Sequence, residues 1–200
     1  MEAGKNGVTA ITPKNILFGA GTIHFGLKYT AGKEGAAGTW NFKESIVGAT
    51  SGGSKFSIVP NVYVPNIDGV DVPVKQLKKK TGGKATMEVN FAETTKQLLK
   101  MATLAAEGAS EDASYDLLVD SSDIPEDAVA ENIAFVGVEL ETNKPVIAIM
   151  DNPMVTNGFD NEFKHNEAMI GKYTFECQAD LENADAFDKL PWRIYWPKTA

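Results

Sequence analysis

Residues 85–91 read Ala-Thr-Met-Glu-Val-Asn-Phe, and this stretch decides the fold class. Met87, Val89 and Phe91 are apolar, whereas the residues between them are polar. An alternation with a period of two is typical of a β-strand that buries one face and exposes the other. Residues 173–179 repeat it, with Tyr, Phe, Cys and Ala at every second position. The sequence therefore predicts strands that pair into half-buried sheets.

Further strand-like stretches lie on both sides of this one. Residues 56–59, 62–64 and 135–140 also alternate between two faces. The segments that separate the strands carry turn signals, at residues 67–70, 81–84, 141–144 and 156–159. Short strands separated by turns are typical of antiparallel sheets in a sandwich or barrel. We therefore predict a mainly β fold of two packed antiparallel sheets, a β-sandwich or half-barrel.

One segment near the middle of the chain, about residues 94–107, has helical periodicity instead. Thr94 and Gln97 have the spacing of a capping box, and Gly108 is a natural helix end. The apolar stripe consists of Leu98, Met101, Ala102 and Ala105. A stripe of this kind needs a sheet face to cover, so we predict one helix that flanks the sandwich. A weaker helical pattern lies within residues 125–131.

Length and composition bound the function classes. The chain has 200 residues, of which 43% are hydrophobic and 23% charged, as expected for a single globular domain. We expect a flexible arm over residues 1–13, one domain over residues 14–200 and a mobile glycine-rich loop at 30–39. No apolar run is long enough to span a membrane, and residues 1–5 lack the apolar core of a secretory signal. Cys177 is the only cysteine, which favours a reducing compartment.

The charges are divided unevenly along the chain. Residues 1–100 hold thirteen lysines and seven acidic residues, whereas residues 101–200 hold five lysines, one arginine and twenty acidic residues. The net charges of the two halves are thus +6 and −14, which together give the −8 of the whole chain. Opposite charges of this kind can attract one copy to another. The acidic total argues against a dedicated nucleic-acid binder.

The sequence contains no recognisable constellation of catalytic or metal-binding residues. His24 is expected to face outward from a strand and His165 to lie in a polar loop, without a nucleophile elbow near either. One cysteine and two distant histidines exclude the usual zinc patterns, and the carboxylates of residues 116–127 lack calcium-loop spacing. Paired carboxylates for glycoside hydrolysis depend on spatial proximity, which spacing does not settle. We predict a protein that is not an enzyme and that has no metal and no cofactor.

Two charged or aromatic segments point to contacts. A basic group lies between two predicted strands and consists of Lys75, Lys78, Lys79, Lys80 and Lys84. It is either a solvated turn or a contact with an acidic surface, which includes that of another copy. Near the C-terminal end stand Trp192, Tyr195 and Trp196. They are too apolar for an unattached tail, so this segment must dock on its own domain or on a neighbour.

The order of these features resembles a known family. The segments that carry the resemblance are residues 52–60, 62–70, 73–78 and 85–91, the helix from Thr94, and the ending 188–195. Together they look like the major tail tube protein of long-tailed, non-contractile bacteriophages. The resemblance covers about residues 14–197 and is best at 52–106. The glycine-rich loop at 30–39 and the acidic stretch 107–131 match nothing in it.

The resemblance implies a structural function. Six subunits would form a ring whose inner sheets join into a continuous barrel, and the rings would stack into a hollow tube that conducts double-stranded DNA from capsid to host cell. The long hairpin at about 59–83 would mediate stacking, with contacts from Val64, Asp68, Lys75, Lys78, Lys79, Lys80 and Lys84. Acidic residues on the bore would repel DNA, so that it passes without specific binding. The arm at 1–13 and the loop at 30–39 would become ordered on assembly.

The resemblance also implies partners and a location. The partners would be other copies of the chain, the tape-measure protein, the tail terminator and the distal tail or baseplate initiator, with no membrane contact. The protein would belong to the virion tail, after assembly in the host cytoplasm. Tubes of contractile particles or of phage-derived bacteriocins are close cousins. Two other classes remain open: a β-sandwich module of the tail that binds carbohydrate or a receptor, and an enzyme on a β-sandwich scaffold.

Overall fold

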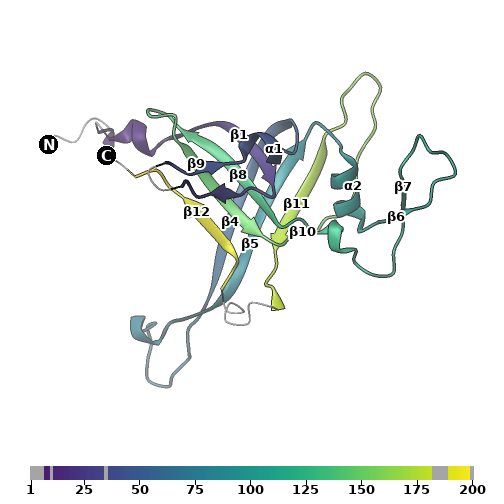
Figure 1. The fold of residues 1–200 in the computed structure, drawn as a ribbon. Helices are drawn as coiled ribbons and strands as arrows, with labels where there is room; N and C mark the ends of the chain where they lie inside the picture. Colours follow the sequence, from purple (N-terminus) through teal and green to yellow (C-terminus); the bar gives the residue numbers. More distant parts are fainter. Residues whose placement is uncertain (1–6, 10, 34–35, 182–188, 199–200) are drawn as a thin grey trace.

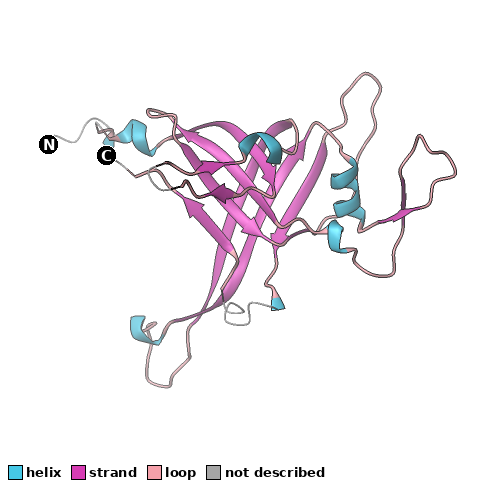
Figure 2. Cartoon of the chain, in the orientation of Figure 1, coloured by secondary structure: helices cyan, strands magenta, loops and turns pink. Residues whose placement is uncertain are grey.

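The computed structural model describes residues 7–9, 11–33, 36–181 and 189–198, and it is built on two four-stranded antiparallel sheets (Figures 1 and 2). The first sheet has the order β1 (Leu17–Phe25), β8 (Asn132–Glu139), β9 (Pro145–Asp151) and β12 (Trp192–Tyr195). The second has the order β10 (Pro153–Val155), β11 (Gly171–Cys177), β5 (Lys79–Phe91) and β4 (Thr50–Tyr63). The predicted mainly β class with packed antiparallel sheets is confirmed.

Smaller elements join these strands. Two ribbons pair β2 (Tyr29–Thr30) with β3 (Thr39–Trp40), and β6 (Ala106–Gly108) with β7 (Leu117–Val119). The α-helices are α1 (Phe42–Ser45) and α2 (Lys96–Thr103), and the 3-10 turns are η2 (Thr12–Asn15), η3 (Lys75–Leu77) and η4 (Glu126–Ala128). Of the predicted N-terminal arm at 1–13, residues 1–6 and 10 lie outside the described residues, as do residues 34 and 35 of the predicted loop at 30–39.

The main core lies between the two sheets. Met87, Val89 and Phe91 of β5 are fully buried, and β11 contributes Tyr173 and Phe175 beside them. The Phe25 ring of β1 meets the Phe175 ring edge to face, with centroids 5.8 Å apart. The two alternating stretches therefore turn their apolar faces toward the first sheet. This contact makes the sandwich.

Helix α2 is shorter than the predicted 94–107. Its N-cap is Thr95, whose side chain accepts a hydrogen bond from the backbone N–H of Leu98, so the predicted cap at Thr94 is wrong by one residue. Leu104 ends it in the left-handed conformation, at φ 54°, and residues 106–108 then form β6 instead of a last helical turn. The stripe residues Leu98, Met101, Ala102 and Ala105 are all buried, with 0 to 6% exposure. The weaker pattern at 125–131 is only the turn η4.

The first sheet is covered on both faces. Its inner face packs on the main core, and its outer face carries a second cluster that joins Leu27, Ile147 and Ile149 to Trp40 and Phe42. The chain between β1 and β4, which includes α1, supplies that cover (Figure 1). Strands buried on both faces lose strict alternation. This is why residues 135–140 follow the period of two less cleanly than β5 does.

The C-terminal aromatic segment docks on its own domain, which settles the choice that the sequence left open. Residues 192–195 form β12 and pair with β9, and Trp192 packs against the main core. The Tyr195 ring meets the Trp40 ring edge to face at 5.0 Å, and Arg193 forms an ion pair with Asp151. Trp196 follows the strand and stays 51% exposed.

Glycine bulges interrupt two of the edge strands. In β1 the register shifts between Phe18 and Thr22, where Gly21 has φ 66°. In β4 it shifts between Thr50 and Ser54, where Gly53 has φ 84°. Only glycine adopts these left-handed angles without strain. Bulges twist an edge and make uncontrolled pairing with other chains harder.

Candidate functional site

The most prominent candidate feature is a projecting hairpin, residues 59–83. From here on we call this hairpin the arm; it is distinct from the predicted N-terminal arm at residues 1–13. It is the distal part of the β4–β5 hairpin and extends away from the body of the molecule (Figure 1). Tyr63 pairs with Lys79, and residues 64–78, including η3, form the tip. No residue of the arm is buried. A projecting segment of this length with no buried residue is a candidate surface for contact with another molecule.

The arm exposes an unusual amount of apolar surface. Eight large apolar side chains are between 39% and 71% exposed: Val59, Val62, Tyr63, Val64, Ile67, Val70, Val72 and Leu77. Asp68 lies in a turn that Gly69 completes with φ 81°. Apolar groups gathered on one projecting element mark an interaction surface rather than ordinary surface scatter.

The predicted basic residues divide into two groups. Lys75, Lys78, Lys79 and Lys80 lie on the arm, are exposed, and have no ion pair within the described residues. Lys84 lies at the base of the hairpin on the outer face of the second sheet, where its Nζ is 2.8 Å from Glu176. Among the described residues, four lysines thus have no ion pair, and the fifth is engaged within the subunit.

The outer face of the second sheet is polar and internally paired. Glu88 of β5 lies 3.2 Å from the Nζ of Lys55 and 3.9 Å from that of Lys172. With the Lys84–Glu176 pair, these contacts balance three lysines against two carboxylates on one open face. The strongly acidic residues of the C-terminal half do not gather here. Nine of the twenty lie on the segment at 107–131, an excursion of the chain beyond α2 (Figure 1).

That excursion is held to α2 by a network of charges. Lys100, only 5% exposed, forms ion pairs with Asp127 and, at 3.5 Å, with Glu107. Lys96 lies 3.2 Å from Glu107 and 2.9 Å from Asp116. The hydrogen bond to Asp127 raises the pKa of Lys100, and the same bond lowers the pKa of Asp127. Both groups therefore stay charged over the physiological pH range, and the network anchors the excursion.

His24 differs from the prediction. It was expected to face outward from its strand; it does point to the outer side of the first sheet, but it is 2% exposed beneath α1. Its Nε2 is 2.7 Å from Thr22 Oγ1 and its Nδ1 is 2.9 Å from Ser45 Oγ. Ser45 Oγ itself donates to the Asn41 carbonyl oxygen, so His24 carries its proton on Nδ1 and accepts from Thr22 through Nε2.

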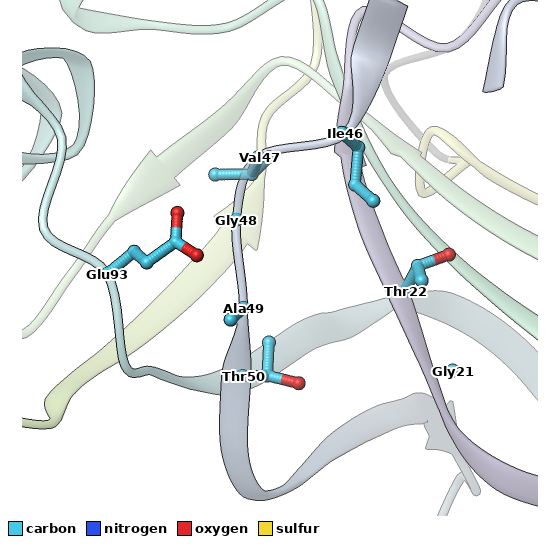
Figure 3. A pocket seen from close by; sticks show the side chains of 8 residues that line it. All are labelled: Gly21, Thr22, Ile46, Val47, Gly48, Ala49, Thr50 and Glu93. Atoms are coloured by element: carbon cyan, nitrogen blue, oxygen red, sulfur yellow. The ribbon is translucent and has the colours of Figure 1, made fainter. Parts of the chain in front are cut away.

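A cleft of about 580 Å³ opens beside this histidine (Figure 3). Its walls are Thr22 of β1 on one side and Glu93 on the other, with residues 46–50 running between them. The Thr22 hydroxyl lies within hydrogen-bond distance of the His24 ring, as a nucleophile does of its general base. The imidazole is 2% exposed and does not line the cleft, however, and its second nitrogen bonds to Ser45 of α1. We therefore assign His24 to the attachment of α1 to β1.

Burial makes His24 a source of pH dependence. Desolvation is the main cause that lowers its pKa below 6.5. Between that lowered pKa and 6.5 the unfolded chain binds the proton more readily than the folded one, so stability falls as the pH drops through this window. We expect the free energy of unfolding to fall by up to about 1.4 kcal/mol for each pH unit there. Denaturant titrations at pH 7.5, 6.0 and 5.0 measure the effect.

The matched variants are His24→Gln and His165→Gln, since His165 lies in an exposed turn. The first should reduce the pH dependence and the second should retain it. An NMR titration of the His24 ring protons with a midpoint above 6.5 would contradict the expectation.

The described part of the chain offers little for other chemistry. Within it, no three His, Cys, Asp or Glu side chains are grouped to hold a metal ion. None of the helices found there is long and apolar enough to cross a membrane. Burial raises the pKa of the Cys177 thiol, which is 8% exposed and therefore a poor nucleophile.

The hairpin at 59–83 was expected from the family resemblance, whereas the polar contacts that link distant segments were not predicted from the sequence. Asn132 is an example: its side chain accepts from the Leu27 N–H at 2.9 Å and donates to the Leu27 carbonyl. A lone polar residue at the start of an apolar strand was the only available signal.

Comparison with known proteins finds no family model that matches the chain and no curated protein that matches it significantly.

Proposed function

We propose that the protein is the subunit of a bacteriophage tail tube, in which rings of six copies stack into a conduit for double-stranded DNA. The observation that carries the proposal is the arm. It projects from a β-sandwich, has no buried residue, and combines exposed apolar side chains with four lysines that have no ion pair within the described chain. A partner must cover such a surface, and the family resemblance supplies a second ring.

The sheet edges suit lateral assembly. β4 and β10 are the edges of the second sheet and lie on its opposite sides. Pairing β10 of one copy with β4 of the next would continue the second sheet around a ring. That sheet would then have no open edge. The outer face of the second sheet would then line the bore. Its lysines are engaged with Glu88 and Glu176, which limits their attraction for phosphate.

This arrangement changes one expectation about the bore. Acidic residues on the bore were expected to repel DNA, and the C-terminal half, with a net charge of −14, could supply them. The charges on the face proposed for the bore are instead nearly balanced. Repulsion of DNA would then be weak, and passage without binding would depend on lysines that are already paired.

Negative-stain electron microscopy of the concentrated protein at moderate salt tests the proposal. Sixfold rings or hollow tubes are the expected result. A closed dimer or a regular oligomer of another symmetry would contradict it. Under the proposal the protein belongs to the virion tail, after assembly in the host cytoplasm. Its further partners would be the tape-measure protein, the tail terminator and the distal initiator.

One observation favours a second candidate, a carbohydrate- or receptor-binding tail module. Tyr29, Trp40 and Tyr195 gather on the outer side of the first sheet, with ring centroids 5.0 to 5.2 Å from Trp40, and the two tyrosines are about half exposed. The Trp40 and Tyr195 planes meet at 75°, so the rings do not form a flat stacking platform. Saturable glycan binding by the monomer, lost in Trp40→Ala, would move this candidate to first place.

A further inference from the structure

The excursion beyond α2 has a composition opposite to that of the arm. We name residues 106–131 the acidic lobe; it holds nine acidic residues and no lysine or arginine. Four of the nine are engaged: Glu107, Asp116 and Asp127 with the lysines of α2, and Glu131 with Lys28 at 2.7 Å. The other five are exposed and have no ion pair within the described residues: Glu111, Asp112, Asp120, Asp123 and Glu126.

The acidic lobe also carries apolar surface. Tyr115 is 71% exposed and Ile124 is 57% exposed, and Leu117 and Val119 of β7 are 42% and 40% exposed. The arm pairs exposed apolar groups with positive charge, and the acidic lobe pairs them with negative charge. An interface between the two would bury apolar groups from both sides and match opposite charges across them.

The two surfaces cannot meet within one molecule. Figure 1 shows the arm and the acidic lobe at opposite ends of the fold, with both sheets between them. Their contact must therefore join different copies. Because the two patches differ, the contact is heterologous, and each added copy leaves one arm and one acidic lobe unoccupied. Such a contact extends a chain of subunits instead of closing it.

We infer that the acidic lobe of one copy is the docking surface for the basic arm of a second copy. The inference rests on the proposed function in naming a second copy as the occupant. It adds the receiving surface, in a stretch for which the family resemblance offers no counterpart. The ion pairs of Lys96 and Lys100 hold the acidic lobe on α2 before binding, which reduces the ordering that docking requires.

Charge exchange between the two surfaces tests the inference. The arm variant carries Lys78→Glu, Lys79→Glu and Lys80→Glu; the lobe variant carries Glu111→Lys, Asp120→Lys and Asp123→Lys. Each alone should weaken self-association by about tenfold or more at low salt, measured by sedimentation. The six-substitution chain, and an equimolar mixture of the two variants, should recover association. The matched control for the lobe variant carries Glu141→Lys, Asp160→Lys and Glu167→Lys. It makes the same change in net charge as the lobe variant, on exposed residues elsewhere, and should associate like the wild type.

A second readout locates the contact. Carbodiimide joins lysines to carboxylates only where they touch, and mixing isotopically heavy and light chains identifies links between copies. Links between lysines 78–80 and the acidic lobe, with recovery in the six-substitution chain, support the inference. If the lobe variant associates like the control, the inference is wrong, and tubes seen in the same samples would keep the proposed function. Arm-to-lobe links without rings or tubes would support the inference and contradict the proposed function. A wild-type protein that stays monomeric at every concentration would overturn both.

Discussion

Replacing Phe175 with alanine should lower the free energy of unfolding by about 3–5 kcal/mol. Phe175 is fully buried on β11, and its ring meets that of Phe25 on the opposite sheet. Truncation would remove the ring where the two sheets touch and leave a cavity that the sandwich only partly fills. A loss of this size is a large fraction of the stability of an ordinary domain. Urea denaturation followed by tryptophan fluorescence gives the value.

The matched control is the same substitution at Phe163. This ring is 77% exposed in the loop before β11, so Phe163→Ala should change the free energy of unfolding by no more than about 0.5 kcal/mol. The comparison holds the chemistry of the substitution constant and varies only burial. A Phe175→Ala protein within 1 kcal/mol of the wild type would mean that the two sheets do not pack as described.

Removing the tip of the arm should abolish assembly and leave the subunit folded. Tyr63 and Lys79 are paired across the hairpin, so residues 64–78 can be replaced by Asn-Gly, the preferred two-residue turn. The deleted residues include none that is buried, and the free energy of unfolding should stay within about 1 kcal/mol of the wild type. Under the proposed function, ring stacking would in contrast lose its main contact. Electron microscopy and sedimentation report assembly, and denaturation reports the fold.

A second loop provides the control for this change. Residues 162–168 are all exposed, and a Gly/Ser segment of equal length can replace them. That variant should assemble like the wild type, which separates the role of the arm from the effect of altering any surface loop. Tubes of normal length from the shortened arm would remove the stacking role. An unfolded product would show instead that the tip contributes to the fold.

The parts of the fold that follow a local period were predictable from the sequence. β5 and β11 alternate because one face meets the core and the other meets water, and α2 shows its stripe for the same reason. The first sheet follows the rule less well, because residues between β1 and β4 return to cover its outer face. No local pattern indicates such a return. The burial of His24 was missed for this reason.

The two charged surfaces, the arm and the acidic lobe, also differ in how far the sequence predicts them. The basic run of the arm is visible in the sequence because its members are neighbours along the chain. The attachment of the acidic lobe was not visible, because it joins Lys100 to Asp127 across 27 positions. The end of α2 was misplaced for a related reason. Leu104 adopts a left-handed angle that its side chain disfavours, and the β6–β7 pairing takes over where the helical pattern would continue.

The order of strands in the two sheets has a consequence for the time course of folding. Ile23 of β1 pairs with Phe135 of β8, and Met87 of β5 pairs with Phe175 of β11, so both sheets join segments far apart in the chain. Pairings of this kind form over milliseconds to seconds, whereas a hairpin such as β4–β5 forms in about 1–10 μs. The tip of the arm, with its exposed apolar side chains, therefore forms long before the two sheets are complete. Encounters between chains then compete with completion of the body, and dilution during refolding should favour the soluble subunit.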